Sequence, residues 1–340
     1  MATAVADRLS RTSTPESVDA DLGALWRELA GRGPLARAVM SNLIVCRRSE
    51  ARDDQARDDR DSTECMVDDR SLDAVMASHP SRTIVLEHDW HDADAAIVDA
   101  GVSVAVFGQS ANRYGVEQIV IRTASSDASL LSIVRRYTRG DLPTALWWTE
   151  DLSRIAPPSA LLDTSRQLLF DSRSWREVRA GVRALAPLVA DDRIDLADVN
   201  WRRLAPVGRA LAHAATTIDE NMSGAHVQMT HRPGEAALAW LLAGCIASTL
   251  GWKADDPWPT IREAEQDERL TLTIDTGASR LSLAMNDHRV IVERPGVAAQ
   301  VSAVPRPDEA EAIAAELRSL SRDRSFHDAL GVLVARIVQS

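Results

Sequence analysis

The stretch from Gly140 to Trp148 constrains the fold more than any other part of the sequence. A Gly140-Asp141 turn precedes the apolar run Leu-Pro-Thr-Ala-Leu-Trp-Trp, which ends in the adjacent tryptophans Trp147 and Trp148. A short run of this kind is typical of a buried strand, in which neighbouring side chains point to opposite faces. Both faces then need cover, from a helix or from a partner. We therefore take Trp147 and Trp148 as candidates for partner recognition.

Helical and strand-like segments alternate over the first two thirds of the chain. Strand-like runs fall at residues 38–46, 82–87, 102–108, 116–122 and 167–170, and helical periodicity separates several of them. This alternation predicts an α/β fold with a layered mixed sheet and covering helices.

The last third of the chain has a different pattern. Apolar and polar residues alternate over 270–275, 280–285 and 290–293, with turn residues between them, and helical periodicity follows over 307–320 and 325–338. The sequence therefore predicts an antiparallel meander with helices, a smaller α+β domain.

The expected domain layout follows from these patterns and from the length, because 340 residues are too many for one comfortable core. We expect a flexible N-terminus at 1–16, an α/β domain at 17–222 and an α+β domain at 233–340. Residues 47–64 are rich in Asp and Arg with almost no apolar side chain, so we expect a charged surface insertion there.

Charge and missing motifs exclude several classes of function. The net charge of −11 argues against a nucleic-acid backbone or an anionic membrane as the main partner. Lys253 is the only lysine, and the chain has no G-x-G-x-x-G, P-loop, G-x-S-x-G, H-E-x-x-H or C-x-x-C motif. It also shows neither a signal-peptide pattern nor a membrane-length apolar run, which predicts a cytoplasmic protein. We expect no catalytic residue and no cofactor.

The most metal-like cluster is His88-Asp-Trp-His-Asp-Ala-Asp94. Two histidines three residues apart, with several carboxylates, offer mixed nitrogen and oxygen ligands. A polar loop after a strand gives the same pattern without any function. Nothing elsewhere completes a zinc signature, so we expect no metal site.

The three cysteines are odd in number and form no disulfide framework. Cys46 ends a predicted strand and Cys65 follows the charged insertion, so either an accessible or an inert thiol fits both positions. Cys245 falls in a long apolar helix and is interpreted as a small core residue.

Two polar groups follow predicted strands. Asp171 and Ser172 come directly after the strand at 167–170, where open α/β sheets bind ligands. Both also fit a simpler role, in which they satisfy backbone donors at a helix start. Asn200, Trp201 and Arg202 open a later helix, and they either face a partner or anchor that helix to the sheet.

Several of these motifs, in order and spacing, resemble the OpcA family of glucose-6-phosphate dehydrogenase assembly proteins. They are Asp141-Leu-Pro-Thr-Ala-Leu-Trp-Trp148, Asp171-Ser172 and Asp198-Val-Asn-Trp-Arg-Arg-Leu204, with Ser41-Asn-Leu-Ile-Val45, His79-Pro-Ser-Arg-Thr-Ile-Val85, Glu235-Ala-Ala-Leu-Ala-Trp-Leu-Leu-Ala-Gly244 and Leu250-Gly-Trp252. The resemblance covers most of the chain, from about residue 20 to the C-terminal region.

The resemblance implies a non-catalytic activator that binds glucose-6-phosphate dehydrogenase of the oxidative pentose phosphate pathway and favours its active oligomer. NADP and glucose 6-phosphate then belong to the partner. It also raises Cys46 and Cys65 as redox candidates. The residues we expect at the partner interface are Trp147, Trp148, Asp171, Ser172, Asn200, Trp201 and Arg202.

One alternative remains, an enzyme or sensor for a sugar phosphate or nucleotide. It would use the loops after the first-domain strands, around His79, Asp171 and Ser172. The arginine-rich composition suits phosphate groups.

Overall fold

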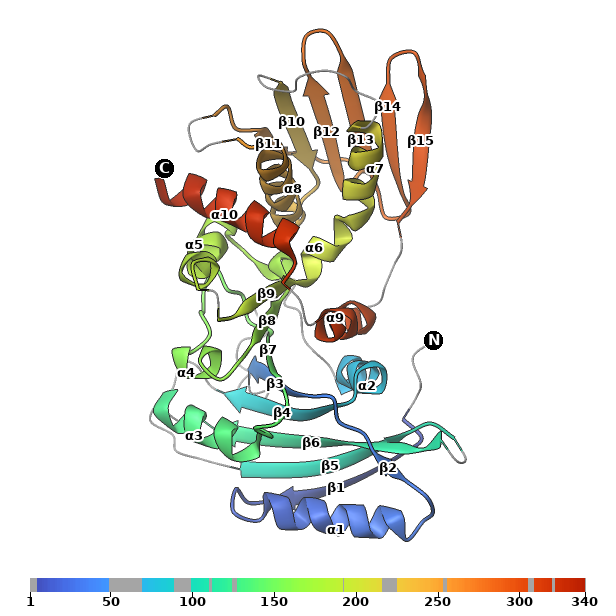
Figure 1. The fold of residues 1–340 in the computed structure, drawn as a ribbon, viewed down its shortest axis with the longest axis vertical. Helices are drawn as coiled ribbons and strands as arrows, with labels where there is room; N and C mark the ends of the chain where they lie inside the picture. The colour runs from blue at the N-terminus through green and yellow to red at the C-terminus, as the bar shows by residue number, and fades with distance from the viewer. Residues whose placement is uncertain are drawn as a thin grey trace.

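Two β-sheets lie toward opposite ends of the long axis of the molecule, with helices between them (Figure 1). The computed structural model describes residues 5–48, 69–88, 99–109, 112–123, 127–191, 193–215, 225–252, 256–304, 309–319 and 322–339. Within these residues the first sheet has nine strands and the second has six.

The first sheet has the strand order β1-β5-β6-β4-β3-β7-β8-β9, and β2 pairs with β6. Its strands are β1 (Asp7–Ser13), β2 (Ala36–Arg37), β3 (Ser41–Arg48), β4 (Ser81–His88), β5 (Asp99–Phe107), β6 (Tyr114–Thr123), β7 (Thr144–Trp148), β8 (Gln167–Phe170) and β9 (Asp195–Asp198). The strands β6, β4, β3, β7, β8 and β9 are parallel to one another. At one edge of the sheet, β5 pairs antiparallel with β6, and β1 pairs antiparallel with β5. The strands β4, β5 and β6 lie on one side of β3, and the later strands β7, β8 and β9 lie on its other side. The strand order therefore reverses between β3 and β7. The predicted mixed α/β sheet is confirmed.

Helices cover both faces of this sheet. The helices are α1 (Val18–Ala30), α3 (Asp127–Tyr137), α4 (Ser159–Leu162) and α5 (Val178–Val189) on one face, and α2 (Asp69–Ser78) and α9 (Glu309–Arg318) on the other. The two tryptophans of β7 point to opposite faces, as predicted: Trp148 packs on the face that α1, α3, α4 and α5 cover, and Trp147 packs on the face that α2 and α9 cover. Their exposed fractions are 1% and 3%, so helices of the chain itself supply the cover that both rings need.

The second sheet has the order β11-β10-β12-β13-β14-β15. Its strands are β10 (His226–His231), β11 (Thr260–Glu263), β12 (Leu270–Asp275), β13 (Arg280–Met285), β14 (Arg289–Arg294) and β15 (Val297–Ala303). Burial alternates along the central strands, and the buried face packs against α7 (Ala205–Ala215) and α8 (Ala236–Thr249). The predicted meander corresponds to β12, β13 and β14 and is confirmed.

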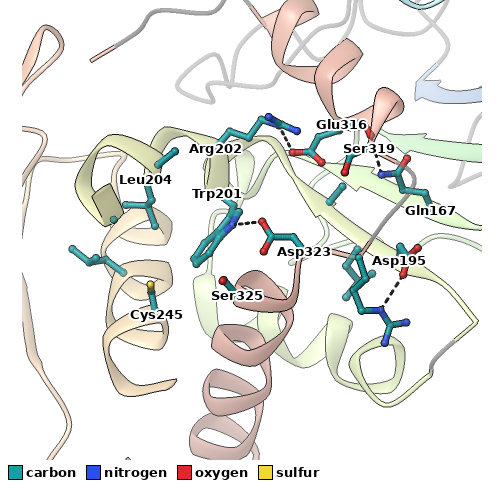
Figure 2. A pocket seen from close by; sticks show the side chains of 16 residues that line it. Gln167, Asp195, Trp201, Arg202, Leu204, Cys245, Glu316, Ser319, Asp323 and Ser325 are labelled. Carbon is teal, nitrogen blue, oxygen red and sulfur yellow. Dashed lines mark hydrogen bonds and ion pairs between the residues drawn. The ribbon is translucent and has the colours of Figure 1, made fainter. Parts of the chain in front are cut away.

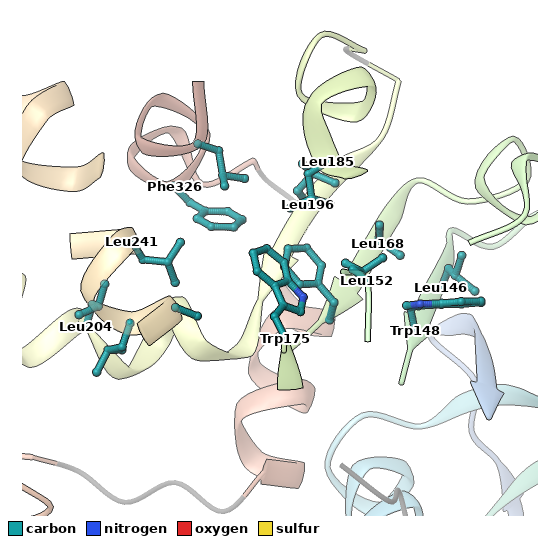
Figure 3. Close-up of a cluster of buried hydrophobic side chains, with 14 of the residues drawn as sticks. Leu146, Trp148, Leu152, Leu168, Trp175, Leu185, Leu196, Leu204, Leu241 and Phe326 are labelled. Atoms are coloured by element: carbon teal, nitrogen blue, oxygen red, sulfur yellow. The ribbon is translucent and has the colours of Figure 1, made fainter. Parts of the chain in front are cut away.

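Aromatic side chains connect the two halves of the molecule. Phe170, at the end of β8, stacks on Trp175 with ring centroids 5.8 Å apart and contacts Phe326 of α10 (Arg324–Gln339) at 6.4 Å. Phe326 in turn lies 5.3 Å from Trp201. Figure 3 shows this cluster passing from Leu168 through Trp175 and Phe326 to Leu241 of α8. The first sheet and α8 therefore share one continuous apolar core.

Six strands differ from the sequence-based expectation, among them the short strands β2 and β9. Residues 7–13, expected to be flexible, form β1 and pair with β5 along their whole length. Residues 226–231, expected to link two domains, form β10 between β11 and β12. The edge strands β11 and β15 were also missed, because their apolar and polar residues do not alternate clearly.

The C-terminal helices reach further than expected. Instead of covering the meander alone, α9 packs against α2 of the first sheet, and α10 packs against α8 and α5. The last part of the chain therefore returns to the first sheet and holds both halves together (Figure 1).

The contact between α8 and α10 gives a testable prediction about stability. A Cβ atom on Gly244 would lie 2.8 Å from the Ala329 carbonyl oxygen and 2.9 Å from Leu333 Cγ, so the helices must separate to accept Gly244→Ala. We expect this substitution to lower the free energy of unfolding by about 1–3 kcal/mol, as other overpacked cores do. Urea denaturation measures the change. Gly331→Ala in α10 is the matched control, because nothing lies within 4 Å of its added Cβ; it should be neutral or stabilising by about 0.5–1 kcal/mol. Equal effects of both substitutions would contradict the close approach.

Candidate functional site

The carboxyl ends of the parallel strands are where open α/β sheets bind ligands, above all where the strand order reverses. Here that point lies between β3 and β7. The sequence holds no glycine between Arg47 and Ala100, so the segment after β3 lacks the residues that let a backbone cradle a pyrophosphate. Thr149, just after β7, donates its hydroxyl to the Cys46 carbonyl oxygen at 2.7 Å and ties the two strand ends together.

The same edge carries a buried polar cluster one step along the sheet, at the ends of β8 and β9. Asp198 Oδ1 accepts the backbone N–H groups of Ser172 at 3.0 Å and of Asn200 at 2.8 Å. The Asn200 side-chain amide donates to Ser172 Oγ at 3.0 Å. Ser172, Asp198 and Asn200 are each at most 1% exposed. The structure therefore brings together Ser172 and Asn200, which the sequence singled out, and adds Asp198 as their common acceptor.

Arg203 joins this cluster to Asp171. Its Nη1 and Nη2 atoms donate to the two oxygens of the Asp171 carboxylate at 3.2 Å each, and Nη1 also donates to Asn200 Oδ1 at 3.1 Å. Such a two-point contact fixes the guanidinium plane as well as its position. Arg203 lies on the short helix α6 (Val199–Arg203), so the contact anchors that helix to the end of β8.

The electrostatics of the cluster centre on Asp198. Burial, and after it the nearby Asp171 carboxylate, raise the pKa of Asp198 to about 7. Asp198 Oδ2 has no hydrogen-bond partner among the described residues. A carboxylate that is half satisfied in a dry site favours its neutral form near physiological pH.

A cavity of about 420 Å³ lies beside the cluster, along the edge strand β9 (Figure 2). Trp201 and Arg202 line it, as do Glu316 of α9 and Asp323, just before α10. Trp201 Nε1 donates to Asp323 Oδ2 at 3.0 Å, and Arg202 Nε forms an ion pair with Glu316. Burial raises the pKa of Glu316, against the opposite pull of Arg202. The predicted site residues Trp201 and Arg202 are thus half-buried, and they hold the C-terminal helices against α6.

The remaining predicted site residues do not join this cluster. Trp147 and Trp148 lie inside the first sheet. Cys46 is buried in the same core, and burial raises the pKa of its thiol far above the usual range. Cys65 lies outside the described residues, as do residues 89–94 of the metal-like cluster. Among the residues that the structure describes, no group of three or more His, Cys, Asp or Glu side chains is arranged to hold a metal.

His79 is placed away from Asp171. It precedes β4, at the amino end of the parallel strands, where its Nε2 contacts Ser41 Oγ at 3.1 Å. Asp171 directly follows β8 and so lies at the carboxyl end of the parallel strands. The loops around His79, Asp171 and Ser172 therefore do not form one site.

Two members of the cluster were not expected, although the sequence contains a signal for one of them. Asp198 is the helix cap: its side chain accepts from Asn200 N at the start of α6. An Asp at the end of a strand and just before a helix is a standard cap signal. Nothing in the sequence pairs Arg203 with Asp171, because the two are 32 residues apart.

Two models of one family match the sequence. The model of the N-terminal domain of the glucose-6-phosphate dehydrogenase subunit matches residues 72–187, and the model of its C-terminal domain matches residues 194–330. No curated protein matches the sequence.

Solved structures with a similar arrangement include a 3-ketoreductase and a super-repressor mutant. KijD10, a 3-ketoreductase from Actinomadura kijaniata, is 14% identical with a TM-score of 0.42, over 88% of this chain and 96% of that one. Gal80p from Saccharomyces cerevisiae, as a super-repressor mutant, is 6% identical with a TM-score of 0.39, over 89% of this chain and 97% of that one. These values are too low to support a conclusion about function. Within the described residues, no helix is both long and apolar enough to cross a membrane.

The raised pKa of Asp198 predicts a pH-dependent stability. Between the unfolded pKa of about 3.9 and the folded value of about 7, the folded state holds a proton that the unfolded state has lost, so stability falls as pH rises. Asp198→Asn keeps the acceptor oxygen and removes the titration. We expect the stability of this variant, measured against that of the unaltered protein, to be higher at pH 8 than at pH 5 by about 2 kcal/mol.

Urea denaturation at the two pH values measures this difference, with the exposed Asp163→Asn as the control. A difference between Asp198→Asn and the unaltered protein that is the same at both pH values would show that Asp198 does not titrate in this range.

Proposed function

The chain belongs to the OpcA family of glucose-6-phosphate dehydrogenase subunits, and from this membership we propose that it is a non-catalytic assembly factor of that enzyme. It binds glucose-6-phosphate dehydrogenase in the cytoplasm and promotes the active oligomer of the oxidative pentose phosphate pathway enzyme. The observation that carries the proposal is the pair of family matches, which together extend from residue 72 to residue 330.

The first sheet supports a role without dinucleotide chemistry of its own. The order of its parallel strands reverses between β3 and β7, as in dinucleotide-binding sheets. The segment after β3 nevertheless has no glycine for a phosphate-binding turn. NADP therefore belongs to the dehydrogenase in this proposal, and this chain contributes a folded surface.

Activation by binding has a simple thermodynamic requirement. The protein must bind the competent conformation or oligomer of the dehydrogenase more tightly than the other one. Each tenfold preference shifts the population ratio tenfold and corresponds to about 1.4 kcal/mol of differential binding energy. A rigid binding surface suits this role because little of that energy is lost in ordering the activator.

The outward face of the second sheet is the surface we propose for this contact. One row of side chains crosses it from strand to strand: Thr230, Thr271, Ala284, Ile291 and Val301. All five are uncharged and half-exposed or exposed, whereas the opposite face packs on α7 and α8. A neutral row in a chain of net charge −11 is unusual for a solvent-facing sheet and typical of an interface core.

The residues expected from the sequence have different places in this proposal. Trp201 and Arg202, half-exposed at the cavity beside α9, remain candidate contacts. Asp171, Ser172 and Asn200 are buried and would act by fixing α6. Direct contact through Trp147 or Trp148 would require the covering helices to move away from the first sheet.

The first test is enzymatic. We expect the same organism's glucose-6-phosphate dehydrogenase to show a changed dependence of velocity on glucose 6-phosphate when this protein is added, because the active oligomer becomes more populated. Size-exclusion chromatography of the mixture should show co-elution. An unchanged velocity curve and separate elution would refute the proposed function.

A substitution at the centre of the neutral row tests the contact surface. Ala284→Arg places a charge between Thr271 and Ile291, and we expect it to weaken binding to the dehydrogenase by about tenfold or more, since a buried unpaired charge disfavours an interface. Ala20→Arg, at an exposed position of α1, is the matched control and should bind as the unaltered protein does. Circular dichroism checks that both variants fold. Unchanged binding by Ala284→Arg would remove this face from the interface.

A further inference from the structure

A second cavity, of about 560 Å³, lies between α6, α7, α9 and the near end of the second sheet. Four of the side chains that line it are arginines, Arg202, Arg203, Arg209 and Arg269, and we call it the arginine cavity. Its volume falls within the range of sites that hold small metabolites, about 300–1,000 Å³. Sites for phosphate groups are commonly built from converging guanidinium groups.

Two of the arginines are held in place from behind. Arg203 is bound through both Nη atoms to Asp171, and Arg269 donates its Nε to Glu235 Oε1 at 2.7 Å. Their side chains are 19% and 11% exposed. Because each acid engages one edge of the guanidinium group, other N–H donors stay available. Among the described residues, nothing accepts a hydrogen bond from the Nη atoms of Arg269. These donors are oriented in advance for an anion.

Arg209 differs from the other three arginines in its surroundings. It is exposed on α7 and forms no ion pair within the part of the chain that the structure describes. The other three arginines each pair with a carboxylate, Arg202 with Glu316, Arg203 with Asp171 and Arg269 with Glu235. Arg209 is the one of these four cations that a bound anion would pair with. Arg209 is therefore the residue whose interaction a ligand would complete.

The remaining lining residues indicate which organic group carries the anion. Asp287, Glu309 and Glu311 line the same cavity. Carboxylates have several acceptor positions each, and hydroxyl groups are the neutral donors that match them. Among the described residues, no aromatic ring lines the cavity, so nothing there would stack on a nucleotide base. A small phosphate ester with several hydroxyl groups fits both sets of side chains.

We propose that the arginine cavity binds a phosphorylated sugar, with the phosphate on the arginines and the hydroxyl groups on the carboxylates. This binding is independent of the proposed assembly function, because it is measured on the full-length protein without any dehydrogenase. A failure here would leave the assembly function standing, and a failure of assembly would leave this site standing.

Isothermal titration of the full-length protein with glucose 6-phosphate, inorganic phosphate and glucose is the test. We expect saturable binding of glucose 6-phosphate, weaker binding of inorganic phosphate and the weakest binding of glucose, because only the first ligand uses both sets of side chains. Equal binding of glucose 6-phosphate and inorganic phosphate would overturn the assignment of a sugar. No binding of glucose 6-phosphate at millimolar concentrations would overturn the site.

Two variants locate the binding. Arg209→Glu should weaken glucose 6-phosphate binding by about tenfold or more, because a charge-assisted contact becomes a repulsion. Its position is exposed, so the fold should tolerate the change. Arg135→Glu, an exposed arginine of α3, is the matched control and should bind normally. Equal binding by the Arg209→Glu variant and the unaltered protein would place the ligand elsewhere and overturn the proposal.

Discussion

The rest of the structure depends on the two backbone hydrogen bonds that Asp198 accepts. Through Oδ1 this one carboxylate holds the chain after β8, at Ser172, and begins α6, at Asn200. The direction of α6 then sets the path into α7 and the second sheet. Burial of the charged form is unfavourable, and the neighbouring Asp171 makes it more so. Arg203 offsets part of that cost by pairing with Asp171, so the cluster functions as one unit.

Aromatic contacts add a packed apolar surface to the hydrogen-bonded connection between the first sheet and α6. Phe170 ends the same strand that leads to Ser172, and its contacts with Trp175 and Phe326 continue to Trp201 on α6. Aromatic pairs contribute roughly 0.5–1.5 kcal/mol each beyond the area they bury. The first sheet, α6 and the C-terminal helix are thereby packed as one body. A partner bound to the second sheet would meet a surface whose position is already fixed.

Much of the first sheet could be predicted because its buried strands are continuous apolar runs, and the residues from Thr144 to Trp148 gave the most specific pattern. Prediction failed where burial is incomplete: β1 is mostly polar, and β15 consists of small residues at an exposed edge. The cluster was half predicted. Ser172 and Asn200 were found by their places after a strand and before a helix, whereas the pairing of Arg203 with Asp171 depends on tertiary geometry that no local pattern contains.

The carboxyl ends of the parallel strands differ in one respect from those of dinucleotide-binding sheets. At the reversal between β3 and β7, Thr149 joins the two strand ends, and the sequence after β3 lacks the glycines of the usual phosphate-binding turn. The polar side chains instead gather at the ends of β8 and β9, where they connect the sheet to α6. Arg203 takes part in that connection and also lines the arginine cavity. A ligand in the cavity would therefore contact the same side chain that fixes α6. The guanidinium group of Arg203 would then take part both in ligand binding and in orienting the second sheet.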